Sequence, residues 1–407
     1  MKCRHCGSVL NLIFADLGTS PPSNSYLSAD QLNGPEEWFP LRVLVCTSCF
    51  LVQTEDFADR EKFFSDDYAY FSSMSSSWLR HCEEYTEKVL KKFSLNNESM
   101  VIEVAANDGY LLQYFLERGI KTLGIEPTTS TANVAREKGI DVVEEFFGED
   151  LGIELSAKGC FADLIIANNV LAHVPDINDF ILGFKELLKP EGVATFEFPH
   201  LFQLICGAQF DTIYHEHYSY LSLFAVEKIL KTNGLEVFDV EELETHGGSL
   251  RVYAKLLGSA RKIESTVSAL INKEIDAGIN SSDFYEGFQE RIIHIKNEFN
   301  RFLLEAQDRG EAVAAYGAAA KGNTLLNYCG IRSDLISFVV DKSASKQGKF
   351  LPGSRIPVVS EEHLQKFKPE CIIILPWNLT DEIMTQLEYV REWGGKFITA
   401  VPALVIR

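Results

Sequence analysis

The segment from Phe210 to Tyr220 carries an unusual density of proton-transferring side chains. At its centre is Tyr214-His215-Glu216-His217-Tyr218, which brings two imidazoles, a carboxylate and two phenols together. A segment serving only as core or as a solvated face has little reason to carry so many. A neutral imidazole, with a pKa of about 6.5, is suited to removing a proton near neutral pH. The segment therefore predicts an acid/base site.

Two other interpretations of this segment stay open. In an extended backbone His215 and His217 point to opposite faces, so at most one of them faces a given pocket. His215 is then a hydrogen-bonded structural residue. A metal site formed by His215, Glu216 and His217 is the other alternative, disfavoured because three consecutive side chains do not easily converge on one ion.

Four of the nine cysteines form two C-x2-C pairs, Cys3 with Cys6 and Cys46 with Cys49. In a reducing compartment such pairs predict four thiolates around a tetrahedral Zn²⁺, with redox dithiols or a chance pattern as alternatives. Four sulfur ligands leave no coordination position open, so this zinc is expected to hold a small domain together and to do no chemistry. The five single cysteines are predicted core thiols.

Between Met100 and Phe198 the sequence alternates between buried strands and helices. Helices are expected over 109–118 and 131–138, and strands over 100–104, 122–126, 142–143, 164–167 and 193–198. This alternation predicts an α/β fold with a doubly wound parallel sheet. Ligands of such sheets bind at the carboxyl ends of the strands, so the loops that follow the strands hold the candidate binding residues.

The loop after the first of these strands stands where nucleotide-binding folds have a glycine-rich turn. It runs from Glu103 through Asn107 and Asp108 to Gly109, and this single glycine disfavours the close approach of a pyrophosphate. S-adenosylmethionine has no phosphate and needs only a tight turn, room for its amino-acid tail and an acid for its ribose. Glu126 ends the second strand, where a carboxylate can accept both ribose hydroxyls. S-adenosylmethionine is therefore the predicted cofactor, with Glu103 placed where class I methyltransferases set an acidic residue near the methionyl group.

Two later loops supply further candidates for the same pocket. Phe146 and Phe147 follow the third strand and can sandwich an adenine ring, although phenylalanines there can equally belong to the core. Asn168 closes the fourth strand. His173 lies in the loop beyond it, which methyltransferases turn toward the reacting methyl group, whereas a lone histidine elsewhere is more often structural.

A smaller Rossmann-like unit is expected in the C-terminal third, after long amphipathic helices over 265–307. It lacks a G-x-G-x-x-G signature, so bound NAD is not expected. The helix that begins after Tyr316-Gly317, with Lys321 and Asn323 near its start, is a candidate substrate-binding site for a diphosphate. Further candidates, with ordinary surface positions as the alternative, are Arg251, Lys342 and the segment Pro376-Trp377-Asn378.

The charge and hydropathy of the chain argue against nucleic acid and membranes as partners. The 407 residues carry a formal net charge of −20, which works against nucleic-acid binding. No apolar run reaches the roughly 20 residues that cross a bilayer, and the first residues do not resemble a signal peptide. We expect a cytoplasmic monomer without membrane association. Its expected modules are a zinc-binding module, a methyltransferase domain and a helical connector with the Rossmann-like domain, over 1–64, 65–255 and 256–407.

In their order and spacing, several motifs resemble the sugar 3-C-methyltransferases of deoxysugar biosynthesis. The resemblance covers nearly the whole chain and rests on the two C-x2-C pairs, the Glu-x3-Asn-Asp-Gly turn at 103–109, Tyr-His-Glu-His at 214–217, His-Gly-Gly-Ser-Leu-Arg at 246–251, and the segment 316–328. It implies a four-cysteine zinc module, a central S-adenosylmethionine-dependent domain and a nucleotide-fold C-terminal domain. The implied substrate is a nucleotide-linked 4-keto-6-deoxy sugar, bound between the middle and C-terminal domains.

The resemblance also implies roles for single residues. His217 corresponds to the base that removes the C3 proton of the sugar. Tyr214, Glu216 and His173 correspond to residues lining the same pocket. Tyr68 matches a pocket tyrosine from the segment that leads into the first long helix, with Tyr70 as the alternative.

Elementary chemistry is consistent with these roles. Carbon attacks a sulfonium methyl group only after it has lost a proton, and a neighbouring ketone stabilises the resulting enolate. His173 or Tyr214 is expected to stabilise the O4 oxyanion, and Glu216 to orient an imidazole. Two other functions stay open: a methyltransferase acting on a hydroxyl or another keto metabolite, and a non-catalytic zinc-stapled scaffold.

Overall fold

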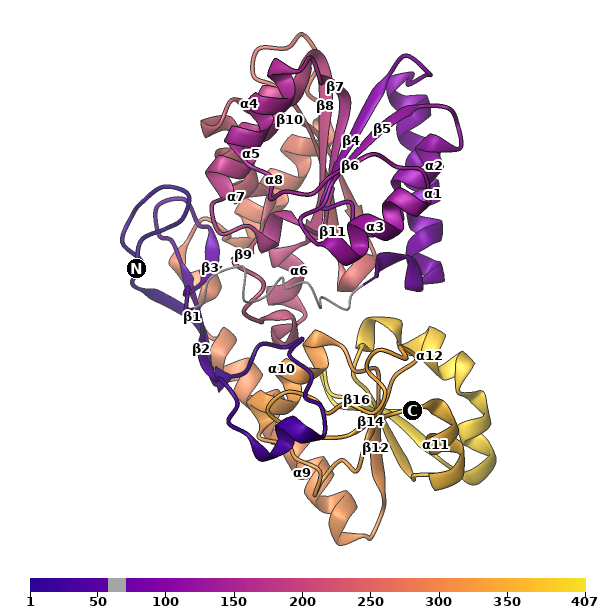
Figure 1. Ribbon diagram of the computed structural model, residues 1–407. Helices are drawn as coiled ribbons and strands as arrows, with labels where there is room; N and C mark the ends of the chain where they lie inside the picture. The colour runs from indigo at the N-terminus through magenta and orange to yellow at the C-terminus, as the bar shows by residue number, and fades with distance from the viewer. Residues whose placement is uncertain (58–70) are drawn as a thin grey trace.

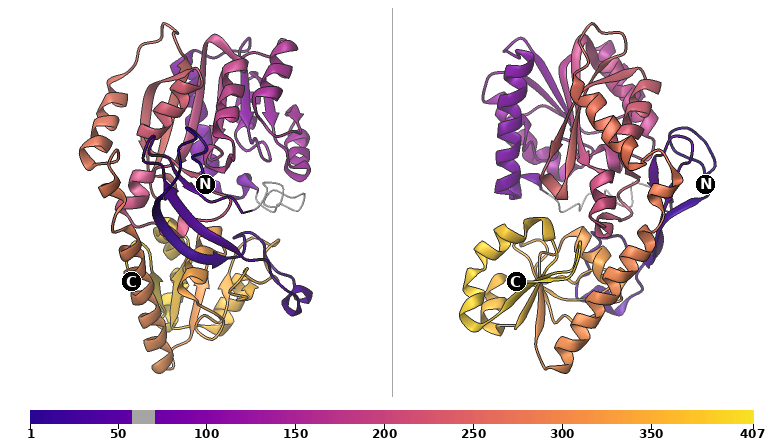
Figure 2. Two further views of the ribbon diagram at one scale, coloured as in Figure 1. Left: turned by 90° about the vertical axis from the view of Figure 1, so that its left-hand side faces the viewer. Right: turned by 180° about the vertical axis from the view of Figure 1, so that it is seen from behind.

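The computed structural model describes residues 1–57 and 71–407 and consists of two α/β lobes with the N-terminal strands beside both (Figure 1). The middle of the chain forms the upper lobe in this view, and its last third forms the lower lobe. Figure 2 shows the N-terminal strands passing across the junction of the lobes. Tyr68 and Tyr70, named above as pocket candidates, lie outside the described residues.

Seven strands form the sheet of the upper lobe: β4 (Met100–Val104), β5 (Lys121–Ile125), β6 (Val142–Val143), β7 (Ala162–Asn168), β8 (Leu188–Pro199), β10 (Leu235–Leu243) and β11 (Ser249–Leu256). Their order is β10-β11-β8-β7-β4-β5-β6, and β11 runs antiparallel to both of its neighbours. Strands β8, β7, β4, β5 and β6 are parallel. Strand order reverses between β4 and β7, where open α/β sheets form their binding crevice. The predicted α/β fold with a doubly wound sheet is confirmed.

Helices cover both faces of this sheet because successive strand residues point to opposite sides. Val101 packs beneath α1 (Ser76–Phe93) and α2 (Leu112–Leu116), whereas Ile102 faces the core under the helices of the other face. Those helices are α4 (Glu149–Ala157), α5 (Ile177–Leu187), α7 (Leu223–Thr232) and α8 (Ser265–Ala277). The remaining helices of this part are α3 (Thr129–Glu137) and α6 (Leu201–Cys206). Helix α2 is shorter than predicted, since a turn with positive φ at Asn107 and Gly109 precedes it.

The lower lobe has a six-stranded sheet in the order β14-β13-β12-β15-β16-β17. The strands are β12 (Val313–Tyr316), β13 (Val339–Val340), β14 (Val358–Val359), β15 (Cys371–Ile374), β16 (Lys396–Thr399) and β17 (Val405–Ile406), all parallel except β17. The helices are α9 (Phe288–Asp308), α10 (Ala320–Cys329), α11 (Glu361–Phe367) and α12 (Thr380–Gln386). This is the Rossmann-like unit expected from the sequence, and α8 and α9 account for the long amphipathic helices expected before it.

A third sheet joins the N-terminal segment to the rest of the chain. It contains β1 (Leu12–Ser20), β2 (Phe39–Val45), β3 (Val52–Thr54) and β9 (Ser219–Tyr220), in that order. Strand β9 comes directly after the Tyr-His-Glu-His segment. Phe14 of β1 stacks on Phe288 of α9 at 4.3 Å between ring centroids, within a core continuous with the lower lobe. The N-terminal module is therefore packed into the body of the molecule.

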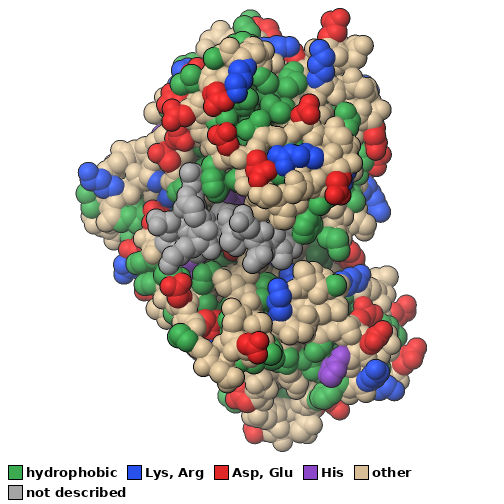
Figure 3. All heavy atoms as spheres, viewed as in Figure 1, with side chains coloured by type: hydrophobic (Ala, Val, Ile, Leu, Met, Phe, Trp, Pro, Cys, Tyr) green, Lys and Arg blue, Asp and Glu red, His purple; other side chains and the backbone are tan. Residues whose placement is uncertain are grey.

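Charged side chains lie over both lobes in the space-filling view, with acidic groups prominent among them (Figure 3). This distribution agrees with the net charge of −20. Within residues 1–57 and 71–407, no helix has the length and apolar character needed to cross a membrane.

Candidate active site

A cavity of about 390 Å³ lies where the upper lobe, the lower lobe and the N-terminal segment meet. The carboxyl ends of β4, β5 and β7 contribute one part of its wall, as expected for a doubly wound sheet. Asn24 comes from the N-terminal segment, His217 from the loop before β9 and Lys321 from α10. Residues far apart in the sequence thus line one cavity.

The part of the cavity at the carboxyl ends of β4, β5 and β7 has the groups that S-adenosylmethionine requires. Glu126 lines it just beyond β5, and its carboxylate accepts hydrogen bonds from the backbone N–H groups of Asn107 and Thr128, both at 2.9 Å. These bonds fix the carboxylate at the mouth of the turn after β4, where Ala105 and Asn107 both have positive φ. Burial raises the pKa of Glu126. A buried carboxylate held in this way is an acceptor for a pair of ribose hydroxyls.

Phe146, Phe147 and Asn168 also line this part, as the sequence analysis expected. Phe147 is only 7% exposed and packs edge-on against Phe180 and Phe184 at 5.6 and 5.2 Å, so most of its ring belongs to the core. Phe146 is 36% exposed and is the more available of the two rings. The side-chain amide of Asn168 is buried, and neither its oxygen nor its nitrogen has a hydrogen-bond partner within residues 1–57 and 71–407, so both atoms can bind a ligand.

His217 is buried at the other end of the cavity. Its Nδ1 lies 2.9 Å from the carbonyl oxygen of Thr212, so Nδ1–H donates to that oxygen and Nε2 carries the lone pair. Burial, followed by the neighbouring His173, holds the pKa of His217 well below its usual value. The ring is therefore a neutral imidazole at neutral pH, in the tautomer that can accept a proton at Nε2.

His173 and Tyr214 lie on either side of this imidazole. The ring of His173 meets it edge-on at 4.7 Å, and the ring of Tyr214 lies over it at 3.9 Å. Burial lowers the pKa of His173 to about 4, while a hydrogen bond that the ring donates to the backbone carbonyl of Glu216 acts in the opposite direction. His173, Tyr214 and His217 all line the cavity, so the structure brings together three of the residues proposed from the sequence.

Glu216 lines the same cavity and is held by the N-terminal segment. Nδ2 of Asn24 donates to both of its carboxylate oxygens, at 2.8 and 3.0 Å. Burial raises the pKa of Glu216 to about 7, against the opposing effect of Asn24. Asn24 is the partner of the Glu216 carboxylate among the described hydrogen bonds, and the orientation of an imidazole by Glu216 stays a prediction.

His215 points away from this group, as an extended backbone requires. Its Nε2 lies 3.1 Å from the carbonyl oxygen of Pro40 and 3.3 Å from that of Phe39, and its ring packs edge-on against Phe39. These contacts match the structural alternative for His215. They also separate its ring from that of His217, so the two imidazoles and Glu216 do not converge on an ion.

Two lysines close the cavity from the lower lobe. Lys321, at the start of α10, donates to Oδ1 of Asn378 at 2.7 Å and lies over the Trp377 ring at 4.7 Å. Burial lowers the pKa of Lys321, and Asp211 opposes that effect. Lys346 donates to the carbonyl oxygen of Ala318 at 2.7 Å. Two cations beside a helix N-terminus form an anion-binding end to the cavity.

Three candidates from the turn after β4 lie behind the cavity wall. Glu103 is fully buried, and burial raises its pKa well above the usual value. Asp108 accepts a hydrogen bond from the hydroxyl of Ser73. Gly109 has φ +74°, and a Cβ there would lie 2.5 Å from Ile140. These residues shape the turn, and none of the three belongs to the described lining.

Arg251 and Asn323 also lie off the described lining. Arg251 sits on β11 directly opposite Glu197 of β8, donates to that carboxylate at 2.6 Å and is buried, which excludes the surface-charge alternative as well. Asn323 is buried and donates to the carbonyl oxygen of Ser23 at 2.6 Å. Both side chains are therefore used in holding elements together.

Asn24, His246 and Lys346 are among the residues of the wall that sequence reasoning missed. His246 has φ +56°, and burial lowers its pKa to about 4. Its Nε2 lies 3.3 Å from Nδ2 of Asn169. The His-Gly-Gly-Ser motif was a usable signal for His246, whereas Asn24 stands in a Pro/Ser-rich stretch and Lys346 in a polar loop, neither of which has a distinguishing pattern.

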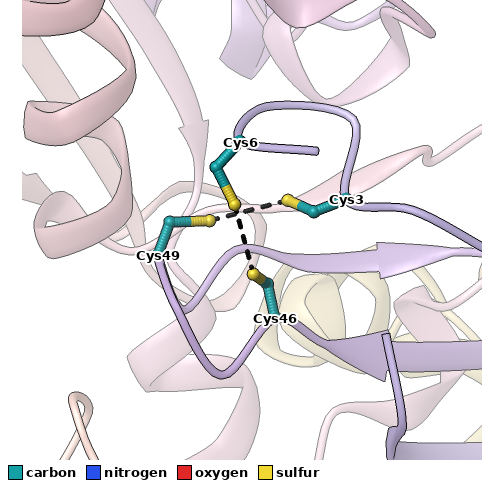
Figure 4. A group of neighbouring side chains, drawn as sticks. All are labelled: Cys3, Cys6, Cys46 and Cys49. Carbon is teal, nitrogen blue, oxygen red and sulfur yellow. Dashed lines mark hydrogen bonds between the residues drawn. The ribbon is translucent and has the colours of Figure 1, made fainter. Parts of the chain in front are cut away.

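The four paired cysteines form a separate cluster at the N-terminus. Their Sγ atoms point toward a common centre and all lie within 4.8 Å of one another (Figure 4). The Cys3–Cys49 and Cys6–Cys46 sulfur distances are 3.6 and 3.5 Å. Tetrahedral Zn²⁺ with Zn–S bonds of about 2.3 Å requires about 3.8 Å between sulfurs, whereas a disulfide requires about 2.05 Å. The convergence of all four sulfurs at these distances fits the predicted structural zinc site.

Comparisons with known proteins agree with this arrangement. Residues 3–64 match a zinc binding domain family, residues 78–240 a methyltransferase domain family and residues 244–402 a C-methyltransferase C-terminal domain family. The chain is 32% identical over 401 residues to C-methyltransferase NovU of Streptomyces niveus, a match that covers 98% of this chain and 95% of NovU.

Two shorter similarities involve the methyltransferase region. One, at 27% identity over 117 residues, is to the uncharacterized methyltransferase OB1106 of Oceanobacillus iheyensis and covers 28% of this chain and 53% of that protein. The other is to the structure of an S-adenosylmethionine-dependent methyltransferase from Clostridium acetobutylicum, with a TM-score of 0.37, 14% identity, and coverage of 44% of this chain and 92% of that one. Because the match to NovU extends over almost the whole of both proteins, the chain belongs to the C-methyltransferase family, and it is an S-adenosylmethionine-dependent methyltransferase with an N-terminal zinc-binding domain.

Proposed function

We propose that the protein removes the C3 proton of a nucleotide-linked 4-keto-6-deoxy sugar and methylates the resulting enolate carbon. The observation that carries this proposal is the state of His217: a neutral imidazole whose Nδ1–H is bound by Thr212, in the wall of a cavity shared with Glu126 and Lys321. Transfer of a methyl group to carbon requires a base at the site, and His217 is a suitable one.

The proton taken from C3 is accepted at Nε2 of His217. The positive charge then formed on the ring is partly offset at Nδ1, whose hydrogen bond to the Thr212 carbonyl strengthens as the imidazole becomes protonated. A ketone at C4 spreads the charge of the carbanion onto O4, which lowers the barrier to proton removal. S-adenosylmethionine, when bound, supplies an electrophilic methyl group on a sulfonium sulfur.

The O4 oxyanion needs a hydrogen-bond donor, and the cavity offers two. His173, whose pKa burial lowers to about 4, is a neutral imidazole with a single ring N–H, which must turn from the backbone carbonyl of Glu216 toward O4 in order to donate. Tyr214 stacks on His217 and lines the same wall. Loss of one such donor typically costs about 10²- to 10³-fold in rate.

The acidic chain needs local cations to hold a diphosphate, and Lys321 and Lys346 supply them at the N-terminus of α10. We assign the diphosphate to this end of the cavity and the sugar to the space beside His217. In this scheme the zinc module, the methyltransferase domain and the Rossmann-like domain occupy about 1–64, 65–255 and 256–407. A reducing compartment keeps the four thiolates available for zinc, and the cytoplasm is the proposed location.

A labelling experiment separates this function from methylation of a hydroxyl. The enzyme would be incubated with S-adenosylmethionine and a panel of nucleotide 4-keto-6-deoxy sugars deuterated at C3. We expect one or more products that have gained a methyl group and lost the deuterium. A methylated product that keeps the C3 deuterium would contradict the proposal, and the position of its methyl group would tell an O-methyl ether from methylation at C5, the other carbon beside the ketone.

A further inference from the structure

The loop that carries His217 is held from outside the methyltransferase domain. Strand β3 leaves the second cysteine pair and pairs with β9, with Val52 opposite Tyr220 and Gln53 opposite Ser219. The next residue, Thr54, continues this contact, since its backbone N–H donates to the carbonyl oxygen of Tyr218 at 3.2 Å. The zinc module therefore runs directly beside the loop that carries His217.

The side chain of Thr54 makes a more specific contact. Its hydroxyl donates to the backbone carbonyl oxygen of His217 at 2.7 Å, in a buried environment. On the other side, the Thr212 carbonyl holds Nδ1 of the same residue at 2.9 Å. The backbone and the ring of His217 are thus fixed independently, and together these bonds define where Nε2 lies.

Two further residues connect Thr54 to the zinc cluster. Gln53 is fully buried, and its Nε2 donates to Sγ of Cys3 at 3.3 Å while its Oε1 accepts from the backbone N–H of Arg4 at 2.9 Å. The guanidinium of Arg4 then donates to the carbonyl oxygens of Thr54, at 3.0 Å, and Pro175, at 2.9 Å. Pro175 belongs to the loop of His173, so the first cysteine pair touches the loops of both histidines.

We propose that Thr54 is a positioning residue for His217, and that Arg4 and Gln53 tie it to the cysteine cluster, so that the zinc module sets the position of the base. This inference rests on the proposed role of His217. Thr54 itself does not belong to the described lining of the cavity, and so it acts through His217. Hydrogen bonds from residues surrounding metal ligands orient those ligands, and here the same contacts extend to a catalytic loop.

A pair of substitutions isolates the hydroxyl of Thr54. Thr54→Val keeps the shape of the side chain and removes the donor, whereas Thr54→Ser keeps the donor. We expect the Val variant to exchange the C3 proton with solvent about 10- to 100-fold more slowly, because a small displacement of a reacting group has an effect of that order. The Ser variant should recover most of the rate, and the dissociation constant of S-adenosylmethionine should be unchanged in both.

Thr19→Val, at an exposed position of β1 in the same module, is the matched control and should exchange at the wild-type rate. The ¹⁵N resonances of the His217 ring provide a readout apart from activity, and they should shift in Thr54→Val and return toward wild type in Thr54→Ser. A Val variant with the wild-type exchange rate would overturn the inference. So would a Ser variant as slow as the Val variant, or a parallel loss of S-adenosylmethionine binding.

The variant His217→Ala separates the role of His217 as the base from the role of Thr54 in positioning it. If this variant exchanges the C3 proton as fast as the wild type, the proposed function itself fails. If His217→Ala is inactive and Thr54→Val is as fast as the wild type, only the positioning role of Thr54 fails.

Discussion

The amide nitrogen of Asn24 lies 2.8 Å from Oε1 and 3.0 Å from Oε2 of Glu216, so a residue near the N-terminus holds a carboxylate almost two hundred positions away. This contact closes the cavity on the side of the N-terminal segment. Among the described residues, Asn24 alone donates side-chain hydrogen bonds to the Glu216 carboxylate, and these bonds oppose the effect of burial, which favours the protonated form. The ionisation of Glu216 is therefore set jointly by its burial and by Asn24.

The first prediction concerns the pKa of Glu216, which burial raises to about 7. Asn24 acts in the opposite direction, so Asn24→Ala should raise this pKa further. The measurement is a titration of ¹³C-labelled glutamate side chains by NMR, with the Glu216 signal assigned from Glu216→Gln. Asn33→Ala, at an exposed position, should leave the titration unchanged. A wild-type value near that of an exposed glutamate would show that the cavity does not shield Glu216.

A second prediction concerns His217, whose pKa burial and His173 hold well below the usual value. A lowered pKa keeps the ring neutral as the pH falls, so His217 should remain neutral and able to act as a base at pH 6. Imidazole ¹⁵N NMR would show this directly, with the resonance identified by its loss in His217→Gln. An imidazolium signal for His217 at pH 6 to 6.5 would contradict the prediction.

Binding of S-adenosylmethionine should depend on Glu126. Glu126→Gln removes the charge that favours two hydroxyl donors, and we expect the dissociation constant to rise by about 10- to 100-fold, since hydrogen bonds to charged groups contribute about 1.5–3 kcal/mol each. Isothermal titration calorimetry measures this, and Glu137→Gln on the exposed side of α3 is the control. Unchanged affinity in Glu126→Gln would place the ribose elsewhere.

Lys321 should act on the sugar nucleotide alone. Lys321→Met is expected to raise KM for the nucleotide sugar by about tenfold or more, because a buried cation beside a helix N-terminus then no longer meets the diphosphate. The affinity for S-adenosylmethionine should stay the same. Lys342→Met changes an exposed lysine of the same lobe and should have little effect. If KM rose equally in both variants, the loss of one positive charge anywhere on the lobe would explain the effect, and Lys321 would not define a diphosphate site.

Sequence periodicity was sufficient to predict the strands that form the floor of the site. Buried strands such as Met100–Val104 and Ala162–Asn168 appear as continuous apolar runs, and the order of the elements then defines the sheet. The hairpin of β10 and β11 was not foreseen. From the sequence alone, Arg251 was a candidate substrate ligand. The pairing of β11 with β8 places Arg251 opposite Glu197, and the two side chains form a buried ion pair.

The walls of the site were harder to predict, because tertiary contacts between distant segments form them. Asn24 reaches Glu216 only after the N-terminal sheet has paired with β9, and Lys346 reaches the cavity only from the loop beyond β13. Neither residue stands in a local pattern that indicates a ligand. The Tyr-His-Glu-His segment was recognisable, by contrast, because its chemistry is concentrated within a few residues.

The most direct test of the account is exchange of the C3 proton in heavy water without any methyl donor. A nucleotide 4-keto-6-deoxy sugar that the enzyme methylates would be incubated in D₂O with the wild type, with His217→Ala and with His215→Asn as the control, and deuterium at C3 would be followed by NMR. We predict enzyme-dependent incorporation by the wild type and by His215→Asn, and a rate at least about 10²-fold lower for His217→Ala. Incorporation by His217→Ala at the wild-type rate would contradict the assignment of His217 as the base.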